Sequence, residues 1–215
     1  MFEDRKDAGE QLALALEKYK DKGVTVLGIP RGGVEVGYYV ARSLGARFSM
    51  VVSRKLPFPD DPESGFGAIA EDGSTFLIER VASRVPEKET KAIQEAQKLE
   101  ILRRVKTLRK GKPLPDLKGR TVILVDDGIA MGATMRAAIL LCRNKRAKKI
   151  VVAAPVAGED VATEIARTVD ELVVLEMPVV FHAVAQVYRH WYDVPDREVL
   201  GIMERWEESR GHGTQ

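Results

Sequence analysis

Two adjacent carboxylates at the end of an apolar run are the residues of this chain best placed to do chemistry. Asp126 and Asp127 follow residues 122–125, four branched apolar residues typical of a buried parallel strand. A loop with two glycines, 128–134, comes next, and residues 135–142 have the pattern of a helix. The order of these parts predicts a strand, an acidic pair, a glycine-containing loop and a helix.

The chemistry of such a unit follows from its parts. Acids at the carboxyl end of a parallel strand face the crevice where open α/β sheets bind ligands, and carboxylates accept hydrogen bonds from sugar hydroxyls, directly or through a divalent cation. Backbone N–H groups of the loop and the first turn of the helix favour an anion, and the Thr134 hydroxyl can cap the helix or bond the same anion. Together they describe a site for ribose 5-phosphate; the alternative is an acidic turn and a helix cap without a ligand.

A second glycine-containing turn lies about 95 residues earlier. Residues 24–29 form an apolar strand pattern, Pro30, Arg31 and the pair 32–33 follow, and residues 34–44 have a helical pattern. A cation beside exposed backbone N–H groups indicates a second anion site. The spacing is neither that of a Rossmann fingerprint nor that of a Walker A loop. The alternative is a tight turn with Arg31 in solvent.

The first unit closely resembles the phosphoribosyl-pyrophosphate (PRPP) binding motif of type I phosphoribosyltransferases, through the residues VILVDDGIAMGAT at 122–134. The resemblance implies that Asp126 and Asp127 hold the ribose hydroxyls and, directly or through water or those hydroxyls, Mg²⁺. It assigns the 5-phosphate to Gly128, Ile129, Ala130, Met131, Gly132, Ala133 and Thr134. Family members commonly carry Thr at the position of Met131, so backbone amides must replace one hydroxyl donor here.

The same resemblance extends to the pyrophosphate side of the site. Arg31, Gly32 and Gly33 correspond in type and chain order to the family's pyrophosphate loop. The resemblance assigns catalytic roles to Arg31, Asp126 and Asp127. In the family, a flexible loop after the second strand closes over the site, here about residues 54–73. Arg54 and Lys55 are its candidate pyrophosphate ligands; ordinary surface charge is the alternative.

A hood over the sheet receives the nitrogenous acceptor in this family. We expect it at about 177–200, together with the N-terminal helix, and the helix at 4–19 is expected to pack without taking part in chemistry. The candidate acceptor residues are an aromatic platform and three polar side chains: Phe181, His182, Gln186 and Tyr188. The alternative for each is a place in the core of the hood.

The rest of the chain alternates strands with helices, which predicts parallel crossovers and an α/β fold. We expect one domain over residues 1–215 with three layers: a central, mostly parallel sheet of the core, about 24–175, and helices on both faces. Pro155 is expected to end the fourth strand, and residues 66–78 suggest a hairpin. Basic residues near the end of a long helix at 86–110 are interpreted as a solvated face rather than a phosphate-binding patch.

Composition narrows the class of protein. The 215 residues are 45% hydrophobic and 31% charged, with a net charge of +2, which gives no argument for nucleic-acid binding. The longest apolar runs are too short for a membrane span, and the charged N-terminus is not typical of a signal peptide. The one cysteine, Cys142, suits a reducing cytoplasm and is expected to be a core residue, not a nucleophile.

These observations predict a cytoplasmic phosphoribosyltransferase of nucleotide salvage that transfers the sugar from Mg-PRPP to an unidentified base. The resemblance implies a homodimer. Three alternatives stay open: a non-catalytic sensor of PRPP or nucleotides with the same fold, an enzyme acting on another phosphorylated sugar, and, least favoured, a nucleic-acid regulator.

Overall fold

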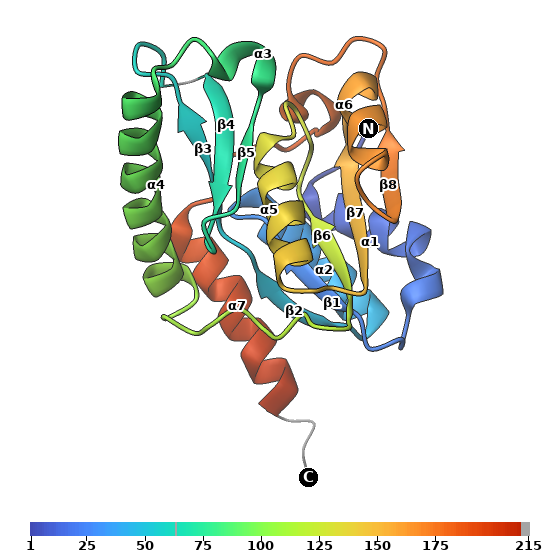
Figure 1. Cartoon of the computed structure of the whole chain (residues 1–215). Coiled ribbons are helices and arrows are strands. Elements are labelled where there is room, and N and C mark those ends of the chain that lie inside the picture. Colours follow the sequence, from blue (N-terminus) through green and yellow to red (C-terminus); the bar gives the residue numbers. More distant parts are fainter. Residues whose placement is uncertain (63, 212–215) are drawn as a thin grey trace.

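The computed structural model describes residues 1–62 and 64–211 of the chain, drawn in Figure 1. Its strands are β1 (Thr25–Gly28), β2 (Arg47–Met50), β3 (Ser53–Pro57), β4 (Gly65–Ala70), β5 (Thr75–Leu77), β6 (Thr121–Val125), β7 (Lys149–Val156) and β8 (Glu171–Glu176). Its α-helices are α1 (Arg5–Ala15), α2 (Gly32–Leu44), α3 (Glu79–Ala82), α4 (Glu87–Leu108), α5 (Ala133–Asn144), α6 (Glu159–Ala166) and α7 (Asp196–Gly211). Short 3₁₀ turns span Glu17–Tyr19 and Val184–Val187. The sequence also predicts a frayed C-terminal end at residues 209–215, of which 212–215 lie outside the described part.

Five strands form one parallel sheet in the order β2-β1-β6-β7-β8. The strand β1 is completely buried, and in β6 only Thr121 is partly exposed. Such strands need apolar cover on both faces, which explains their near-continuous apolar sequences. The predicted parallel α/β sheet is confirmed, and its central pair brings together two loops far apart in the sequence.

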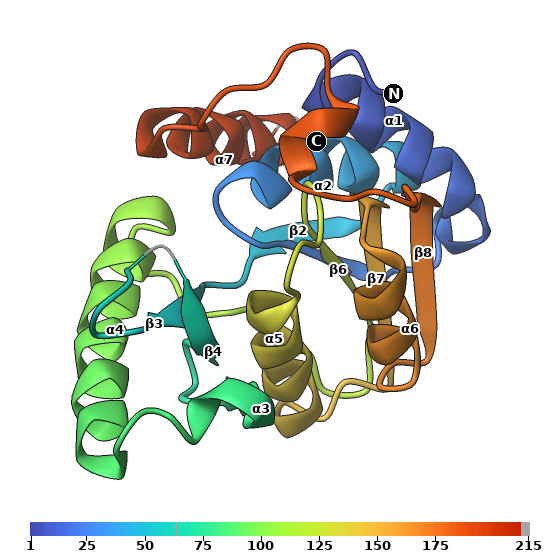
Figure 2. The same ribbon diagram turned by 90° about the horizontal axis from the view of Figure 1, so that it is seen from above.

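Helices cover both faces of this sheet, as the view from above shows (Figure 2). On one face, α1, α2 and α7 pack against side chains such as Val26 and Ile123. On the other face, α5 and α6 pack against the alternate residues of the same strands, such as Leu27 and Leu124. The expected three layers are therefore present, because successive side chains of a strand point to opposite faces.

A smaller antiparallel sheet, β3-β4-β5, lies beside the main sheet and packs against α4 (Figure 2). The predicted hairpin is confirmed as β4 and β5. The interpretation of 54–73 as one loop is wrong, because β3 and β4 occupy half of that segment. The sequence does not reveal β3, because Arg54 and Lys55 near its start are basic. The strand is held in place by Leu56 and Phe66, which are buried against α4.

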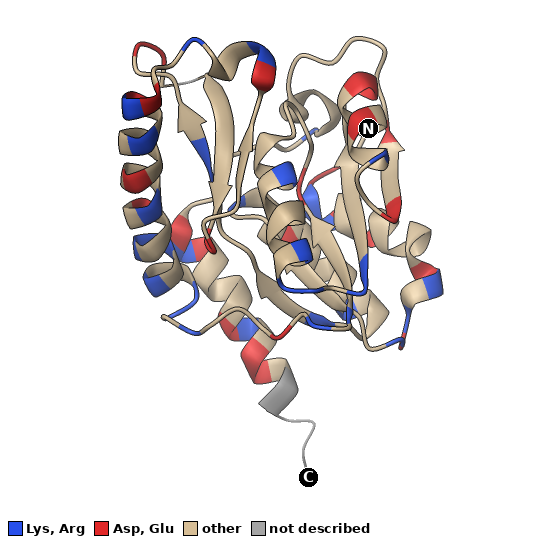
Figure 3. Cartoon of the chain, viewed as in Figure 1, with Lys and Arg blue, Asp and Glu red and all other residues tan. Residues whose placement is uncertain are grey.

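The long predicted helix is α4, whose exposed side carries both signs of charge along its length (Figure 3). Several of these charges pair within the helix: Lys91 with Glu87, Lys98 with Glu95, and Arg103 and Arg104 with Glu100. This pattern is typical of a solvated helix face.

The fourth strand runs further than expected, because Pro155 lies within β7 instead of ending it. Pro155 comes after Ala153, the last residue of β7 paired with β6, so its missing N–H costs no bond to that strand. Beyond β8, the hood segment at 177–195 packs on the N-terminus. Phe2 forms a parallel bridge with Tyr188, and its N–H donates to the Val187 carbonyl at 2.7 Å. The expected association of the hood with the N-terminal segment is therefore present.

Candidate active site

The acidic pair and the second glycine-containing turn meet at the carboxyl ends of β6 and β1. These two strands are neighbours, with Gly28 opposite Val125, and the Ile29 N–H donates to the Val125 carbonyl at 2.9 Å. The two loops thus leave the sheet side by side, where α/β sheets place ligands. The structure brings together residues about 95 positions apart, as the sequence predicts.

Both glycines of the turn press directly on the acidic pair. A Cβ atom built on Gly32 would lie 1.8 Å from Asp127 Oδ2, and one on Gly33 would lie 2.8 Å from Asp126 Oδ1. No side chain fits at either position, so glycine is required by close approach. The peptide bond from Pro30 to Arg31, just before these glycines, is cis.

The two carboxylates differ in their partners. Asp126 Oδ1 accepts a hydrogen bond from the Asp127 N–H at 2.9 Å, while Asp127 Oδ2 accepts one from Arg5 Nε at 2.8 Å. Burial, and then the neighbouring charge of Asp127, raise the pKa of Asp126 well above its usual range. The Arg5 guanidinium therefore binds Asp127, whereas the Asp126 carboxyl accepts a hydrogen bond from the backbone N–H of Asp127.

Arg5 is a site residue that the sequence analysis missed, since the N-terminal helix was expected to take no part in chemistry. It lies at the start of α1 with only 3% of its side chain exposed. Its Nη1 donates to the Tyr192 carbonyl at 3.0 Å, and its guanidinium lies 4.1 Å from the centre of the Trp191 ring. A signal was present: Arg5, Ala8 and Leu12 share one helix face, which is the buried one.

The predicted phosphate loop runs from Gly128 into α5. Ile129 is buried and bridges to Ala157, whereas Met131 has 62% of its surface exposed. Ala130 is also exposed, Ala133 is the first residue of α5, and Thr134 is the second. The N-cap is Gly132, at φ 69°, and no side chain caps the helix, so the cap suggested for the Thr134 hydroxyl is absent.

A buried arginine supports this loop from behind. Arg136 Nη1 donates to the Met131 carbonyl at 3.0 Å, and its Nη2 donates to Glu164 at 2.5 Å. The guanidinium also lies 5.1 Å from the centre of the Phe76 ring. These contacts fix the Met131 backbone while its side chain points outward.

The three cations predicted for pyrophosphate have different surroundings. Arg31 is 38% exposed and lies 3.8 Å from Asp196 at the start of α7. Arg54 donates from Nε to Gln97 of α4 at 3.1 Å, and burial lowers its pKa. Lys55 is half-buried on β3. Their roles at the pyrophosphate stay predictions.

The hood residues also divide. The Tyr188 hydroxyl donates to the Asp127 carbonyl at 2.7 Å, so it holds the backbone of the acidic pair. Gln186 accepts from the His182 N–H and donates to the Val180 carbonyl, both at 2.8 Å, which shapes the hood loop. The Phe181 ring lies against Gly158, at the end of β7. Tyr188 is thus tied directly to the acidic pair, and the acceptor roles of all four candidates stay predictions.

A carboxyl group of α2, that of Glu35, interacts electrostatically with Arg5. Burial raises the pKa of Glu35 to about 7, opposed by Arg5 and reinforced by Glu198 and Asp4. The Tyr192 hydroxyl lies 2.6 Å from Glu198 and 3.5 Å from Glu35. Arg5 therefore interacts with two acidic residues, through a hydrogen bond to Asp127 and electrostatically with Glu35.

Comparison with known proteins decides the family. The model of the phosphoribosyl transferase domain matches residues 4–189. This chain belongs to that family. The match includes both loops, the acidic pair and Arg5.

Two relatives support the membership of the phosphoribosyl transferase family. A Mycobacterium tuberculosis (strain H37Rv) protein named "Putative phosphoribosyl transferase Rv0571c" is 42% identical over 207 residues, which are 95% of this chain and 47% of that protein. The chain thus spans about half the length of this relative. The crystal structure of TT1426 from Thermus thermophilus superposes with a TM-score of 0.81 at 36% identity, covering 95% of this chain and 98% of the other.

The site of this phosphoribosyl transferase domain offers carboxylate oxygens, which suit a hard cation such as Mg²⁺. Among residues 1–62 and 64–211, no three His, Cys, Asp or Glu side chains come together as a metal site.

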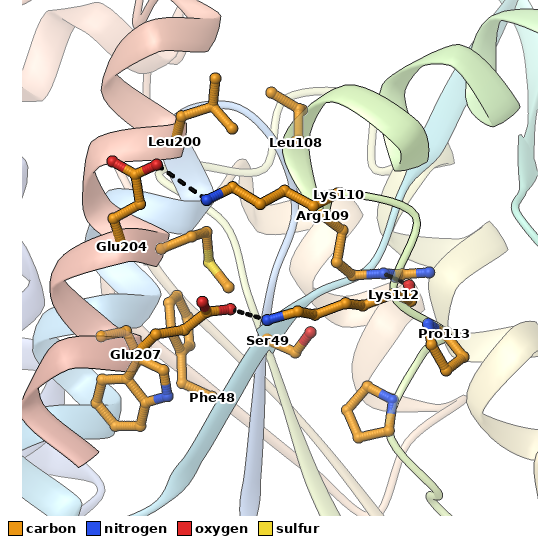
Figure 4. Close-up of a pocket in the computed structure, with 13 residues that line it drawn as sticks. Phe48, Ser49, Leu108, Arg109, Lys110, Lys112, Pro113, Leu200, Glu204 and Glu207 are labelled. Carbon is orange, nitrogen blue, oxygen red and sulfur yellow. Dashed lines mark hydrogen bonds and ion pairs between the residues drawn. The ribbon is translucent and has the colours of Figure 1, made fainter. Parts of the chain in front are cut away.

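A cavity of about 480 Å³ lies elsewhere in the domain, between α7, β2 and the loop after α4 (Figure 4). Lys110 pairs with Glu204 and Lys112 with Glu207 across it. Its lining contains none of the predicted site residues. In the described part of the chain, no helix is long and apolar enough to cross a membrane.

Proposed function

We propose that this protein is a phosphoribosyltransferase that displaces pyrophosphate from Mg-PRPP with a nitrogenous, nucleobase-like acceptor. The observation that carries the proposal is the contact between the two loops: Gly32 and Gly33 press on Asp127 and Asp126 at the ends of adjacent strands. One loop offers backbone N–H groups and a cation, and the other offers two carboxylates and the start of a helix. A ribose with pyrophosphate on C1, a phosphate on C5 and hydroxyls on C2 and C3 matches this set of groups.

In the proposed reaction, the bond between C1 of the ribose and the pyrophosphate oxygen breaks, and its electron pair leaves with pyrophosphate. The lone pair of the acceptor nitrogen forms the new bond to C1, and the acceptor then loses its proton. The anomeric carbon becomes cation-like on the way, as in glycosyl transfer generally. The Mg²⁺ of the substrate complex offsets the charge of the leaving pyrophosphate.

The protein's part is positioning and charge stabilisation. Asp126 and Asp127 accept from the ribose hydroxyls, and the loop from Gly128 to α5 binds the 5-phosphate through backbone N–H groups. Arg31 and the turn after it receive the departing pyrophosphate. The partial exposure of Arg31, and its long contact with Asp196 at 3.8 Å, leave its guanidinium available for that role.

The test is calorimetric titration of the protein with PRPP and Mg²⁺, with ribose 5-phosphate and AMP as comparators. We expect the wild-type protein to bind PRPP, and the double variant Asp126→Asn with Asp127→Asn to lose binding. The double variant Glu87→Gln with Glu89→Gln, at the exposed start of α4, changes the net charge equally and is the control. Thermal unfolding of each variant shows whether it is folded.

Pyrophosphate release over a panel of nucleobases then tests catalysis. Release with one base supports the transferase and identifies the acceptor. PRPP or AMP binding without release from any base would favour the sensor, and preference for ribose 5-phosphate over PRPP would favour an enzyme of another phosphorylated sugar. Equal PRPP affinity of the wild type and the Asn double variant would refute the ribose site.

A further inference from the structure

Arg5 joins the acidic pair to the hood, although it comes from the N-terminal helix, 122 residues away from Asp127. The start of α1 is fixed by Asp4, whose side chain accepts from the Asp7 N–H at 2.9 Å. Residues just before it are tied to the hood: the Arg189 N–H donates to the Phe2 carbonyl at 2.9 Å. The N-terminus and the hood thus form one support that holds the guanidinium in place.

The guanidinium has three kinds of neighbour. Its Nε donates to Asp127 Oδ2, its Nη1 donates to the Tyr192 carbonyl, and its face lies against the Trp191 ring. On the fourth side, a Cβ atom on Gly32 would come within 2.9 Å of Arg5 Nε. The acidic pair, the turn at residues 30–33 and the hood therefore meet at the buried guanidinium of Arg5.

We propose that Arg5 is a positioning residue of the phosphoribosyl transfer, a fixed cation that orients Asp127 toward the ribose hydroxyls without the help of a metal ion. This inference rests on the proposed function. One oxygen of Asp127 is held by Arg5, which leaves Oδ1 as the acceptor for a sugar hydroxyl. The charge that the pair presents to the substrate is also reduced by one, so ribose recognition does not depend on Mg²⁺ at Asp127.

Loss of the guanidinium has a defined consequence. Without the guanidinium, the two adjacent carboxyl groups lose the cation that lies beside them, and Asp127 becomes free to turn away from the sugar. A hydrogen bond to a charged group is worth roughly 1.5–3 kcal/mol, which corresponds to about 10- to 100-fold in affinity. The loss is greatest where no metal ion can take over the charge.

The experiment measures ribose 5-phosphate affinity in EDTA for the wild type, Arg5→Met, Arg5→Lys and Arg189→Met. Met keeps the packing of the stem, Lys keeps the charge, and Arg189 is an exposed arginine of the same support, paired with Glu3. We expect Arg5→Met to lose about 10-fold or more, Arg5→Lys to stay within about threefold, and Arg189→Met to match the wild type. The same titrations with Mg-PRPP should show a smaller loss for Arg5→Met.

Each result separates the two proposals. A folded Arg5→Met protein that binds ribose 5-phosphate in EDTA as well as the wild type overturns the role of Arg5 and leaves the transferase intact. Equal losses in both titrations, with a lowered unfolding temperature and no rescue by Lys, show a purely structural role and overturn it as well. A wild-type protein that binds neither ligand refutes the proposed function itself.

Discussion

Arg109 and Arg5 are both buried and both pair with carboxylates, but their bonds differ. Arg109, at the end of α4, binds both oxygens of Glu71, at 2.9 and 2.6 Å, and donates to the carbonyls of Met50 and Lys112. Arg5 binds one oxygen of Asp127 and one carbonyl, and a ring covers its face. The first pair ties the small sheet to the edge of the main sheet, and the second lies between loops.

The two pairs differ in how many oxygens of the carboxylate the arginine binds. Arg109 has a bidentate pairing that needs nothing further, which is the geometry of a structural contact. The Asp127 side chain binds Arg5 through one oxygen, so its other oxygen can accept from a ligand, and Asp126 lies beside it. In the pair of Arg5 and Asp127, one carboxylate oxygen is left to bind a ligand beside the glycine-containing turn, which favours a binding role. In the pair of Arg109 and Glu71, both oxygens are bound, which favours a structural role.

The largest effect we predict is on the pair of Arg109 and Glu71. Arg109→Met leaves Glu71 buried without its partner, since the two side chains are 5% and 11% exposed. Removal of one member of a buried pair costs about 3–5 kcal/mol. Urea unfolding should show this loss, with Lys110→Met, an exposed neighbour paired with Glu204, close to the wild type. PRPP affinity of the folded Arg109→Met protein should be unchanged; a matching loss of affinity would erase the distinction between the two pairs.

The sequence predicted the parts of this site that depend on local order. Residues 122–134 carry a strand, an acidic pair and a loop in one segment, and the neighbouring position of the turn at 30–33 follows from parallel strand topology. The role of Arg5 could not be predicted, because its partner is 122 residues away and only the tertiary fold shows which cation reaches Asp127. Its place on the apolar face of α1 was the one local sign.

The strand β3 could not be predicted for a related reason. Arg54 and Lys55 have no alternating apolar pattern, and the strand exists because Leu56 is buried against α4 while the backbone pairs with β4. Pairing partners of this kind are not written in the local sequence. The segment expected to be one flexible loop therefore supplies two strands of an antiparallel sheet.

A pH effect is expected on the side of Arg5. Arg5 faces Asp127 and also Glu35, whose pKa burial raises to about 7, with Asp4 and Glu198 adding negative charge. Because the folded protein holds this proton more tightly than the unfolded chain, the group lowers the free energy of unfolding as the pH rises from about 4.5 to about 7.

Glu35→Gln removes this dependence. We expect the variant to be more stable than the wild type at pH 8, by on the order of 1 kcal/mol after solvent screening, and equal to it near pH 4. Unfolding temperatures measured across this range check the prediction. A constant difference at all pH values would show that Glu35 acts through packing and not through its charge.

The smallest predicted effect concerns the ring over Arg5. Trp191 is 37% exposed, and the Arg5 guanidinium lies 4.1 Å from the centre of its ring. Trp191→Leu keeps apolar cover but removes the π face, which is worth about 0.5–1 kcal/mol at a partly exposed site. PRPP affinity should fall by about two- to fivefold, and Trp191→Phe, which keeps a ring, should lose less. If Leu and Phe lose equally, the ring contributes cover alone, and the hydrogen bonds of Arg5 to Asp127 and Tyr192 suffice to hold it.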